Sequence, residues 1–500
     1  MKISVIIPTH NRAESLTRAI ESLLAIKEES AFEVVVVDNN STDNTKDVAE
    51  RYSEHFPGMF RYVFEKRTAF TKARSTGAEN ASGDIFLYID DDVILQRGSL
   101  DNIAKIFTTY PDTGIIAGKI LSECKQDPPQ WVVDCQRAFN GLSLFMKGVG
   151  APKRDAGDFQ EVTWAAGPMM AVRADLYWKV GGFPPDTIGV ETNRGEKTFK
   201  KIYVGSGDTG LSQRIREIGY KVYYSEDISC YHVIDPVRFT VGFWRSRMVG
   251  EGHYNAVSNR EFHKFSPVKL FLERKQAIIS YLLFREKLSE QLIEKEKRSP
   301  GIVSGGMFPD ELWLWYYKSY LETDLILRKN PNFSVFLWDI ATDGVDDNDF
   351  SYVMGRFPDE YKMMISEENT ILSDSPLKTA NDLDSLTIHP EIACEIIEME
   401  RLIAGIAEAV QGSVDRKSLL TFLFNEKVSE KVLMLFSNIL KQDSPVPELL
   451  EWVGCICIEL GYRETSAKVF QQALRLASAK DEVKKLIECL DGASSLCIAK

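Results

Sequence analysis

Two short β-branched runs near the N-terminus, Ile3–Ile7 and Val34–Val37, are apolar on both faces, and they constrain the fold more than any other feature. A strand with one face in water alternates apolar and polar residues, whereas a strand covered by helices on both faces is apolar throughout. The residues between the two runs that recur at helical spacing are Leu16, Ile20, Leu23 and Leu24. This alternation predicts parallel strands connected by helices, which is an α/β fold.

The same pattern continues through the first half of the chain. The further runs that predict strands are Arg61–Phe64, Ile85–Ile89, Gly114–Ala117, Thr163–Val172 and Lys221–Tyr224. Helical patterns separate most of these runs, notably Ser99–Thr108 and Thr209–Ile218. We therefore predict one α/β domain with a mainly parallel sheet over residues 1–255.

The pattern changes after about residue 260, where long charged helical patterns such as Val268–Lys297 replace the β-branched runs. A break at Ser299–Gly301 ends that pattern. A chain of 500 residues can bury more than one core, so we predict a helical extension over 256–340 and an all-α domain over 341–500. The aspartate-rich segment Asp339–Asp349 is interpreted as a solvated linker, because it lacks the spacing of an EF-hand calcium loop.

A helical hairpin that resembles a tetratricopeptide unit is predicted within residues 446–490. The residues at its packing positions are Leu450, Val453, Gly454, Cys457, Gly461, Ser466, Phe470 and Ala473. One such unit cannot bury its own apolar face, so the segment is either the last of several degenerate repeats or a chance hairpin. A repeat would offer the C-terminal helices to a protein partner.

The composition argues against nucleic-acid binding and against a membrane span. The net charge is −13, whereas nucleic-acid binding requires clustered Lys and Arg. Residues 1–260 carry 32 Lys and Arg against 34 Asp and Glu, so the first half is nearly neutral and suits a phosphorylated ligand. The eight scattered cysteines are interpreted as reduced core residues, and no run of 18 apolar residues occurs.

These features predict a cytoplasmic protein. The Lys-bearing stretch Val268–Lys297 has two interpretations. It is either a solvated helix that packs on the first domain or a peripheral contact at the inner face of the membrane.

The apolar run Ile85–Ile89 ends in three consecutive acids, Asp90, Asp91 and Asp92. Parallel sheets bind ligands at the carboxyl ends of their strands, where these acids are expected to lie. Adjacent carboxylates repel one another, and a divalent cation or ligand hydroxyls would offset that repulsion. Mg²⁺ and Mn²⁺ prefer such oxygen ligands. The alternative is an acidic turn that caps the helix beginning near Ser99.

Polar residues also follow the first two predicted strands, as Pro8–Arg12 and Asp38–Asp43. We expect them to meet at one edge of the sheet, where their hydroxyls, carboxylates and arginine suit a ribose, a base edge and a phosphate. Taken singly, Asp38 and Ser41 are equally well explained as helix N-caps.

Further along, Gly205–Gly210 matches the glycine pattern of a dinucleotide-binding loop, with Glu226 and Asp227 near the spacing of a ribose-binding acid. The match comes after several strands, and no second βαβ unit follows it. NAD binding is therefore an alternative with little support from its surroundings.

Taken in order, several of these stretches resemble the family 2 glycosyltransferases, which have the GT-A nucleotide-sugar-binding fold. The matching stretches are Val5–Arg12, Val37–Asp43, Ala73–Gly77, Gly83–Asp84 with Asp90–Asp92, and Val180–Phe183. The resemblance covers about residues 1–255. It implies a nucleoside-diphosphate sugar as donor, with UDP the commonest expectation in the family and GDP or TDP left open.

The resemblance also implies roles for individual residues. Arg67 or Arg74 would approach the base or the diphosphate, Asp90 and Asp91 would meet ribose and sugar hydroxyls, and Asp92 would ligate Mn²⁺ or Mg²⁺. The residues implied to hold the nucleoside are Pro8, Thr9, Arg12, Asp38 and Asn40.

For the catalytic base the resemblance implies Asp208, which would take the proton of the acceptor hydroxyl as that oxygen attacks the anomeric carbon and inverts it. His232 matches a late histidine of the family that resembles a metal or diphosphate ligand, and the alternative is a buried structural histidine. The arginines that could neutralise the leaving diphosphate, or form a solvated basic face, are Arg238, Arg245 and Arg247.

Three positions depart from the family pattern. Gly207 replaces the glutamate before the catalytic aspartate, Ala69 replaces a glycine, and Met169 replaces a frequent asparagine. A non-catalytic nucleotide-sugar-binding protein with a helical interaction module is therefore the alternative function. The acceptor is open among polysaccharide, lipid-linked sugar and protein, with cell-envelope or exopolysaccharide glycans usual for the family.

Overall fold

A computed structural model provides the structure of the chain. The residues that it describes are 1–26, 30–66, 70–138, 159–184, 187–188, 202–203, 207–261, 264–298, 309–329, 382–383, 386, 388–409, 415–442 and 447–476. They divide into two compact units, an α/β unit up to Trp244 and a helical unit from Arg245 onward.

The α/β unit contains a nine-stranded sheet and a two-stranded one. The strands of the large sheet are β1 (Ile3–Thr9), β2 (Phe32–Asp38), β3 (Phe60–Phe64), β4 (Ile85–Ile89), β5 (Val93–Leu95), β6 (Thr113–Cys124), β7 (Phe159–Val162), β8 (Met169–Arg173) and β11 (Lys221–Ile234). The small sheet consists of β9 (Thr187–Ile188) and β10 (Ile202–Tyr203). The helices are α1 (Ala13–Leu24), α2 (Thr45–Ser53), α3 (Phe70–Glu79), α4 (Ser99–Thr109), α5 (Gln130–Ala138), α6 (Ala174–Lys179) and α7 (Gly207–Glu217), with a 3₁₀ turn η1 at Pro236–Phe239.

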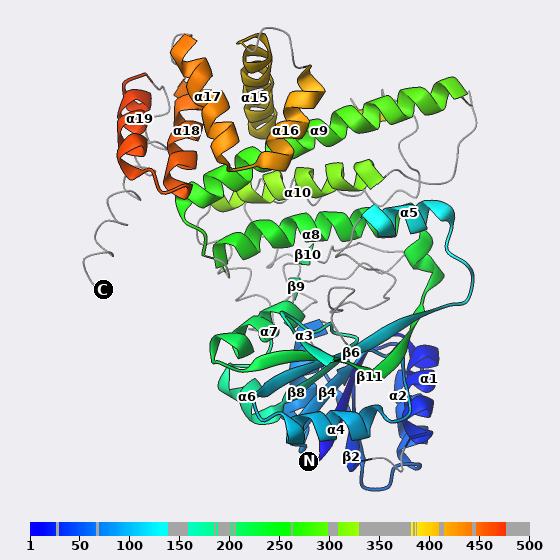
Figure 1. Cartoon of the computed structure of the whole chain (residues 1–500). Coiled ribbons are helices and arrows are strands. Elements are labelled where there is room, and N and C mark those ends of the chain that lie inside the picture. The colour runs from blue at the N-terminus through cyan, green and yellow to red at the C-terminus, as the bar shows by residue number, and fades with distance from the viewer. Residues whose placement is uncertain are drawn as a thin grey trace. The chain divides into compact units, whose positions relative to one another are not determined.

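The large sheet is open and mixed, and its labelled strands include β2, β4, β8, β6 and β11 (Figure 1). The full strand order is β3-β2-β1-β4-β8-β6-β11-β5, and β7 pairs with β11. Strands β3, β2, β1, β4, β6 and β11 run in one direction, and β8, β5 and β7 run in the other. The predicted α/β class with a mainly parallel sheet is therefore confirmed.

Helices cover both faces of this sheet, which explains why its first strands are apolar throughout. In β2, Val34 and Val36 belong to one buried cluster with Leu16 of α1, and the alternate Val35 and Val37 belong to another. The first cluster also receives side chains from α2 and α4, and the second receives them from α3, α6 and α7. Side chains alternate between the faces of a strand, so both alternating sets must be apolar here.

Two sequence predictions for the strands need correction. The predicted strand Thr163–Val172 was right for Met169–Val172 and wrong for residues 163–168, because β7 ends at Val162 and β8 begins at Met169, with a non-strand segment between them. The short strand β5 was not predicted, and β11 extends ten residues beyond the predicted Lys221–Tyr224.

The second unit is all-helical in its described residues, as predicted. Its helices are α8 (Val241–Glu261, which begins at the end of the first unit), α9 (Pro267–Arg298), α10 (Pro309–Lys329), α15 (Pro390–Ala409), α16 (Arg416–Glu426), α17 (Glu430–Gln442), α18 (Pro447–Glu459) and α19 (Arg463–Leu476). None of the helices in the described ranges is long and apolar enough to cross a bilayer.

Helices α18 and α19 form a hairpin within the segment compared above with a tetratricopeptide unit (Figure 1). A Cβ at Gly454 would lie 2.5 Å from the Phe470 ring, and Ser466 Oγ donates to the Gly454 carbonyl at 2.8 Å. The turn contains Gly461 at φ 88°, a conformation that favours glycine. The likeness to a repeat stays a prediction. The interpretation of all cysteines as core residues was wrong for Cys394, which is exposed, and for Cys124, which is partly exposed. It holds for the four buried cysteines, Cys135, Cys230, Cys455 and Cys457, and Cys489 and Cys497 lie outside the described residues.

We expect Gly77→Ala to destabilise the α/β unit. A Cβ at Gly77 of α3 would lie 2.3 Å from Ile6 Cγ2 of β1, so either the Ile6 side chain or the helix would have to shift. Such overpacking costs about 1–3 kcal/mol. Hydrogen exchange measured by mass spectrometry should be faster in the peptides of α3 and β1.

Gly405→Ala in α15 is the matched control, because no atom lies within 4 Å of its added Cβ. It should slow exchange locally, since alanine stabilises a helix interior by about 1 kcal/mol over glycine. Unchanged exchange in α3 and β1 of the Gly77→Ala protein would contradict the close packing of this helix.

Candidate active site

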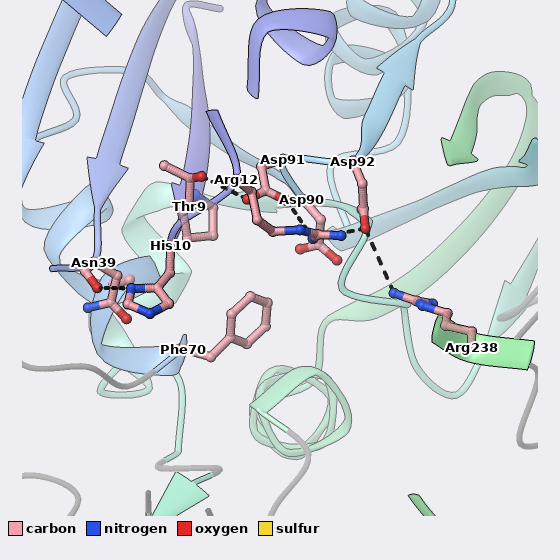
Figure 2. A pocket seen from close by; sticks show the side chains of 11 residues that line it. Thr9, His10, Arg12, Asn39, Phe70, Asp90, Asp91, Asp92 and Arg238 are labelled. Carbon is pink, nitrogen blue, oxygen red and sulfur yellow. Dashed lines mark hydrogen bonds and ion pairs between the residues drawn. The ribbon is translucent and has the colours of Figure 1, made fainter. Parts of the chain in front are cut away.

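Three acids follow β4 at the sheet edge where β1 and β2 also end. The parallel register places Thr9 of β1 opposite Asp38 of β2, and β4 pairs with the other side of β1. The acids border a cavity of about 350 Å³ (Figure 2). Its lining residues are Pro8, Thr9, His10, Arg12, Asn39, Phe70, Ala73, Asp90, Asp91, Asp92 and Arg238. The polar residues predicted from the ends of β1 and β4 are thus brought together.

The middle acid, Asp91, is buried, and both of its carboxylate oxygens accept hydrogen bonds. Thr9 Oγ1 donates to Asp91 Oδ2 at 2.7 Å, and Arg12 Nη1 donates to Asp91 Oδ1 at 2.7 Å (Figure 2). Burial raises the pKa of Asp91 to about 7, although the Arg12 guanidinium opposes this effect. A ligand hydroxyl near Asp91 would therefore meet a carboxyl that changes protonation near neutral pH.

Asp92 is surrounded by positively charged or ionisable groups. Arg12 Nη1 lies 3.0 Å from Asp92 Oδ2, and Arg238 Nη2 lies 3.8 Å from the same oxygen (Figure 2). His232 Nε2 lies 3.1 Å from Asp92 Oδ1. Burial would raise the pKa of Asp92, but the His232 imidazole, Arg12 and Arg238 outweigh it and hold the pKa below its usual range. Asp92 is therefore an anion at neutral pH.

Strand pairing brings His232 to Asp92 across a long sequence separation. His232 in β11 is the antiparallel partner of Val93 in β5, and the backbone N–H of Val233 donates to the Asp92 carbonyl at 2.8 Å. The site therefore depends on β5, which the sequence pattern did not reveal.

The carboxylate of Asp92 and the imidazole of His232 face each other with atoms that suit a divalent cation. Their side chains are each 3% exposed, Asp92 Oδ1 lies 3.1 Å from His232 Nε2, and His232 Nδ1 lacks a hydrogen-bond partner in the described part of the chain. Carboxylate and imidazole are suitable donors for Mn²⁺. No group of three or more His, Cys, Asp or Glu suited to a metal occurs in the described ranges. A cation here would therefore take its remaining ligands from phosphate and water.

Asp90 and Asp208 share one arginine. Arg74 Nη2 donates to Asp90 Oδ1 at 3.0 Å, and Arg74 Nη1 donates to Asp208 Oδ1 at 2.5 Å. The second oxygen of Asp208 accepts from the backbone N–H of Gly167 at 2.7 Å. Burial raises the pKa of Asp90, and Arg74 opposes that shift. Asp208 lies in the first turn of α7, where the helix dipole favours a negative charge.

The predicted residue Asp38 lies behind the cavity and does not line it. It is 2% exposed, and its oxygens accept from Tyr62 Oη and from the backbone N–H of Ser41, both at 2.8 Å. Asn40 is also absent from the lining and has φ 66°, as part of the turn that follows β2. Arg67 lies outside the described residues.

The alternative that Asp38 and Ser41 merely cap a helix does not describe the loop. The N-cap of α2 is Asn44, and Asp43 instead accepts from the backbone N–H of Ala13, at the start of α1, at 3.1 Å. The loops after β1 and β2 are thereby tied to each other.

Of the three candidate arginines, only Arg238 borders the cavity. Arg245 and Arg247 belong to the helical unit, where they pair with Glu311 and Glu251 respectively. Sequence reasoning also missed Gly167, although the Ala-Ala-Gly-Pro segment around it could have indicated a turn inside the supposed strand.

Residues 4–181 match the model of the family described as Glycosyl transferase family 2. A glucosyl-dolichyl phosphate glucuronosyltransferase of Haloferax volcanii is 25% identical over 264 residues, covering 51% of this chain and 77% of that protein. An uncharacterized glycosyltransferase of Nostoc is 35% identical over 116 residues, covering 23% and 36%. A validoxylamine A glucosyltransferase of Streptomyces hygroscopicus is 27% identical over 211 residues, covering 37% and 48%. The matches thus span less than half of two of these three relatives.

Two solved structures are also similar. S. aureus TarS 1–349 in complex with UDP-GlcNAc is 18% identical with a TM-score of 0.35, covering 66% of this chain and 92% of that one. A mannosyltransferase of Pyrobaculum calidifontis in complex with GDP-Man and Mn²⁺ is 16% identical with a TM-score of 0.34, covering 74% and 80%.

The family match coincides with the region that forms the site. It begins in β1 and ends just after α6, so it includes every residue of the acid cluster and the cavity except Arg238. Asp208 and His232 lie beyond it. Residues 4–181 are therefore similar to glycosyl transferase family 2 domains.

Proposed function

We propose that this chain is an inverting, metal-dependent glycosyltransferase. It transfers a sugar from a nucleoside-diphosphate sugar, with UDP favoured as the nucleotide, to an acceptor hydroxyl. The observation that carries the proposal is the row Asp90–Asp92. Its three acids pair with arginines and line a cavity at the strand ends of the region that matches family 2, and Asp91 and Asp92 are buried. The cavity of about 350 Å³ falls in the size range of small-molecule sites.

In this proposal the donor lies across the ends of β1 and β4. Thr9 and Asp91 offer hydrogen bonds to the nucleoside, and Asp90 offers them to the sugar. Arg12 and Arg238 lie beside Asp92 and also line the cavity. Their guanidinium groups would neutralise the negative charge of a diphosphate bound there. Asp38 and Asn40 act by holding the loop after β2.

Asp92 and His232 would hold Mn²⁺ or Mg²⁺. When bound there, the cation would act as a Lewis acid that stabilises charge on the departing nucleoside diphosphate. The carboxylate keeps its negative charge at neutral pH because His232, Arg12 and Arg238 lower its pKa.

Asp208 acts as the general base. One of its oxygens takes the proton of the acceptor hydroxyl while that hydroxyl oxygen forms a bond to the anomeric carbon. The bond between the anomeric carbon and the diphosphate breaks on the opposite face, and its electron pair leaves with the diphosphate. The anomeric configuration is therefore inverted.

The acceptor in this proposal is a saccharide hydroxyl of a cell-envelope or exopolysaccharide glycan. The name of the Haloferax relative, which specifies a glucosyl-dolichyl phosphate, supports a lipid-linked acceptor. A polysaccharide hydroxyl would use the same base and the same donor site.

Asp208→Asn should keep the affinity for the donor and lose turnover by about 100-fold to 10,000-fold, because the amide cannot accept the acceptor proton. Transfer and donor hydrolysis with a panel of UDP-, GDP- and TDP-sugars measure the turnover. The control is Glu217→Gln, an exposed position on the same helix. Undiminished turnover in Asp208→Asn would show that Asp208 is not the general base. A wild-type chain that binds a donor but turns over none would favour the non-catalytic alternative.

Asp92→Ala should abolish the dependence of UDP binding on manganese. In the wild-type protein, Mn²⁺ should tighten UDP binding by about tenfold or more, as measured by titration calorimetry with and without the metal. The control is Asp47→Ala, an exposed acid on α2, which should behave as wild type. An equal manganese effect in Asp92→Ala and wild type would contradict the assignment of Asp92 as a metal ligand.

A further inference from the structure

Arg74 is one of the most deeply buried charged residues of the α/β unit. Its side chain is 1% exposed, whereas the carboxylates that it bonds, Asp90 and Asp208, are 21% and 28% exposed. The guanidinium therefore lies behind the two acids and joins them from the protein side. A planar guanidinium can bond two carboxylates at once through separate nitrogens, which a lysine cannot do in the same way.

Three aromatic rings surround this guanidinium. Its central carbon lies 4.0 Å from the ring centroid of Phe70, 5.5 Å from that of Phe183 and 6.0 Å from that of Tyr88. Cation–π attraction is stronger in such a desolvated setting. Phe183 follows two glycines at φ 79° and 68°, and this turn positions its ring. The aromatic rings and the two carboxylates together leave the guanidinium little freedom to reorient.

Asp208 is fixed from a second direction as well. The backbone N–H of Gly167 bonds its other oxygen, and a Cβ at Gly167 would lie 2.4 Å from that oxygen and 2.6 Å from Arg74 Nη2. Ser212 Oγ donates to the Asp208 carbonyl at 2.8 Å and accepts from the Ala165 N–H at 3.2 Å. The loop between β7 and β8 is thus bonded directly to the first turn of α7.

We infer that Arg74 is a positioning residue. It fixes the position of Asp208 relative to Asp90, the acid that meets the sugar in the proposed function, and it does not bind the donor itself. The inference rests on the proposed function, because it gives Asp208 the role of base. It assigns Arg74 a task different from the base or diphosphate contact that the family resemblance implies.

The cavity lining supports this distinction. Phe70 and Ala73 of α3 line the cavity, whereas Arg74 and Asp208 do not, so the helix presents its aromatic ring to the cavity and directs its arginine to the proposed base. The arginines that do line the cavity are Arg12 and Arg238. A donor diphosphate would meet these two cations first.

The test compares Arg74→Gln, Arg74→Lys and the wild-type chain. The probes are UDP with Mn²⁺ for affinity, and the panel sugar nucleotide that the wild-type chain hydrolyses fastest for kcat and KM. Arg74→Gln should lower kcat by about 100-fold, the effect of a misplaced reacting group, with the UDP affinity and the donor KM changed less than threefold. Arg74→Lys should recover about tenfold of the loss, because it restores the charge but reaches only one carboxylate. Arg173→Gln, on the exposed pair with Asp175, should match wild type.

A double-mutant comparison separates positioning from a direct role. In an Asp208→Asn background, Arg74→Gln should lower the remaining kcat by less than threefold, since two residues that act as one unit are not additive. Gly167→Ala, which displaces the same carboxylate without removing a charge, should also lower kcat with UDP affinity retained. Circular dichroism and thermal melting establish that each variant is folded, and the Gly167→Ala and Arg74→Lys proteins carry the test where Arg74→Gln does not fold.

Two results would overturn the inference while leaving the proposed function intact. One is a large rise in donor KM or loss of UDP affinity in Arg74→Gln with kcat unchanged, which would make Arg74 a donor ligand. The other is a full additional loss of kcat in the Asp208→Asn background. Absence of turnover in the wild-type chain with every sugar nucleotide would instead contradict the proposed function.

Discussion

The organisation of the site follows from the electrostatic cost of three consecutive carboxylates at the end of a buried strand. Asp91 and Asp92 are each 4% exposed, so an ionised form loses most of its hydration and also repels its neighbours. Arg12 lies between these two acids, and Arg74 offsets the charge of Asp90. Both arginines that line the cavity, Arg12 and Arg238, lie beside Asp92, so the acids and these cations form one charge-paired cluster.

The compensating groups come from elements that are far apart in the chain. Arg12 immediately precedes α1, Arg74 belongs to α3, Arg238 to η1 and His232 to β11. They converge only after β1, β4, β5 and β11 have taken their places in one sheet. The apolar strands and the polar edge are therefore one cooperative structure, in which the buried cores supply the free energy that holds like charges together.

The sequence correctly predicted those features that depend on residues close together in the chain. The run Ile85–Ile89 has the predicted bounds, because an all-apolar strand that ends in acids has sharp limits. The strand predicted over Thr163–Val172 was wrong for residues 163–168, where the Gly167 N–H bonds a carboxylate 41 residues away, a contact that no local pattern reveals. The proximity of His232 to the acids depends on β5, which is too short to give a periodic signal. Arg74 gave no sign of burial, since arginine usually lies at the surface.

The same electrostatic constraint gives a reason for Gly207, where the family pattern has a glutamate before the proposed base. Arg74 already balances two carboxylates, Asp90 and Asp208, so this cluster carries a net negative charge that the first turn of α7 and the Gly167 N–H help to stabilise. Gly207 is buried, and a third carboxylate there would add a charge with no further cation supplied by the described contacts around Asp208. A glycine at this position therefore fits the proposed base, whose carboxylate is bonded by Arg74 and by a backbone amide, and the departure from the family pattern leaves Asp208 itself in place.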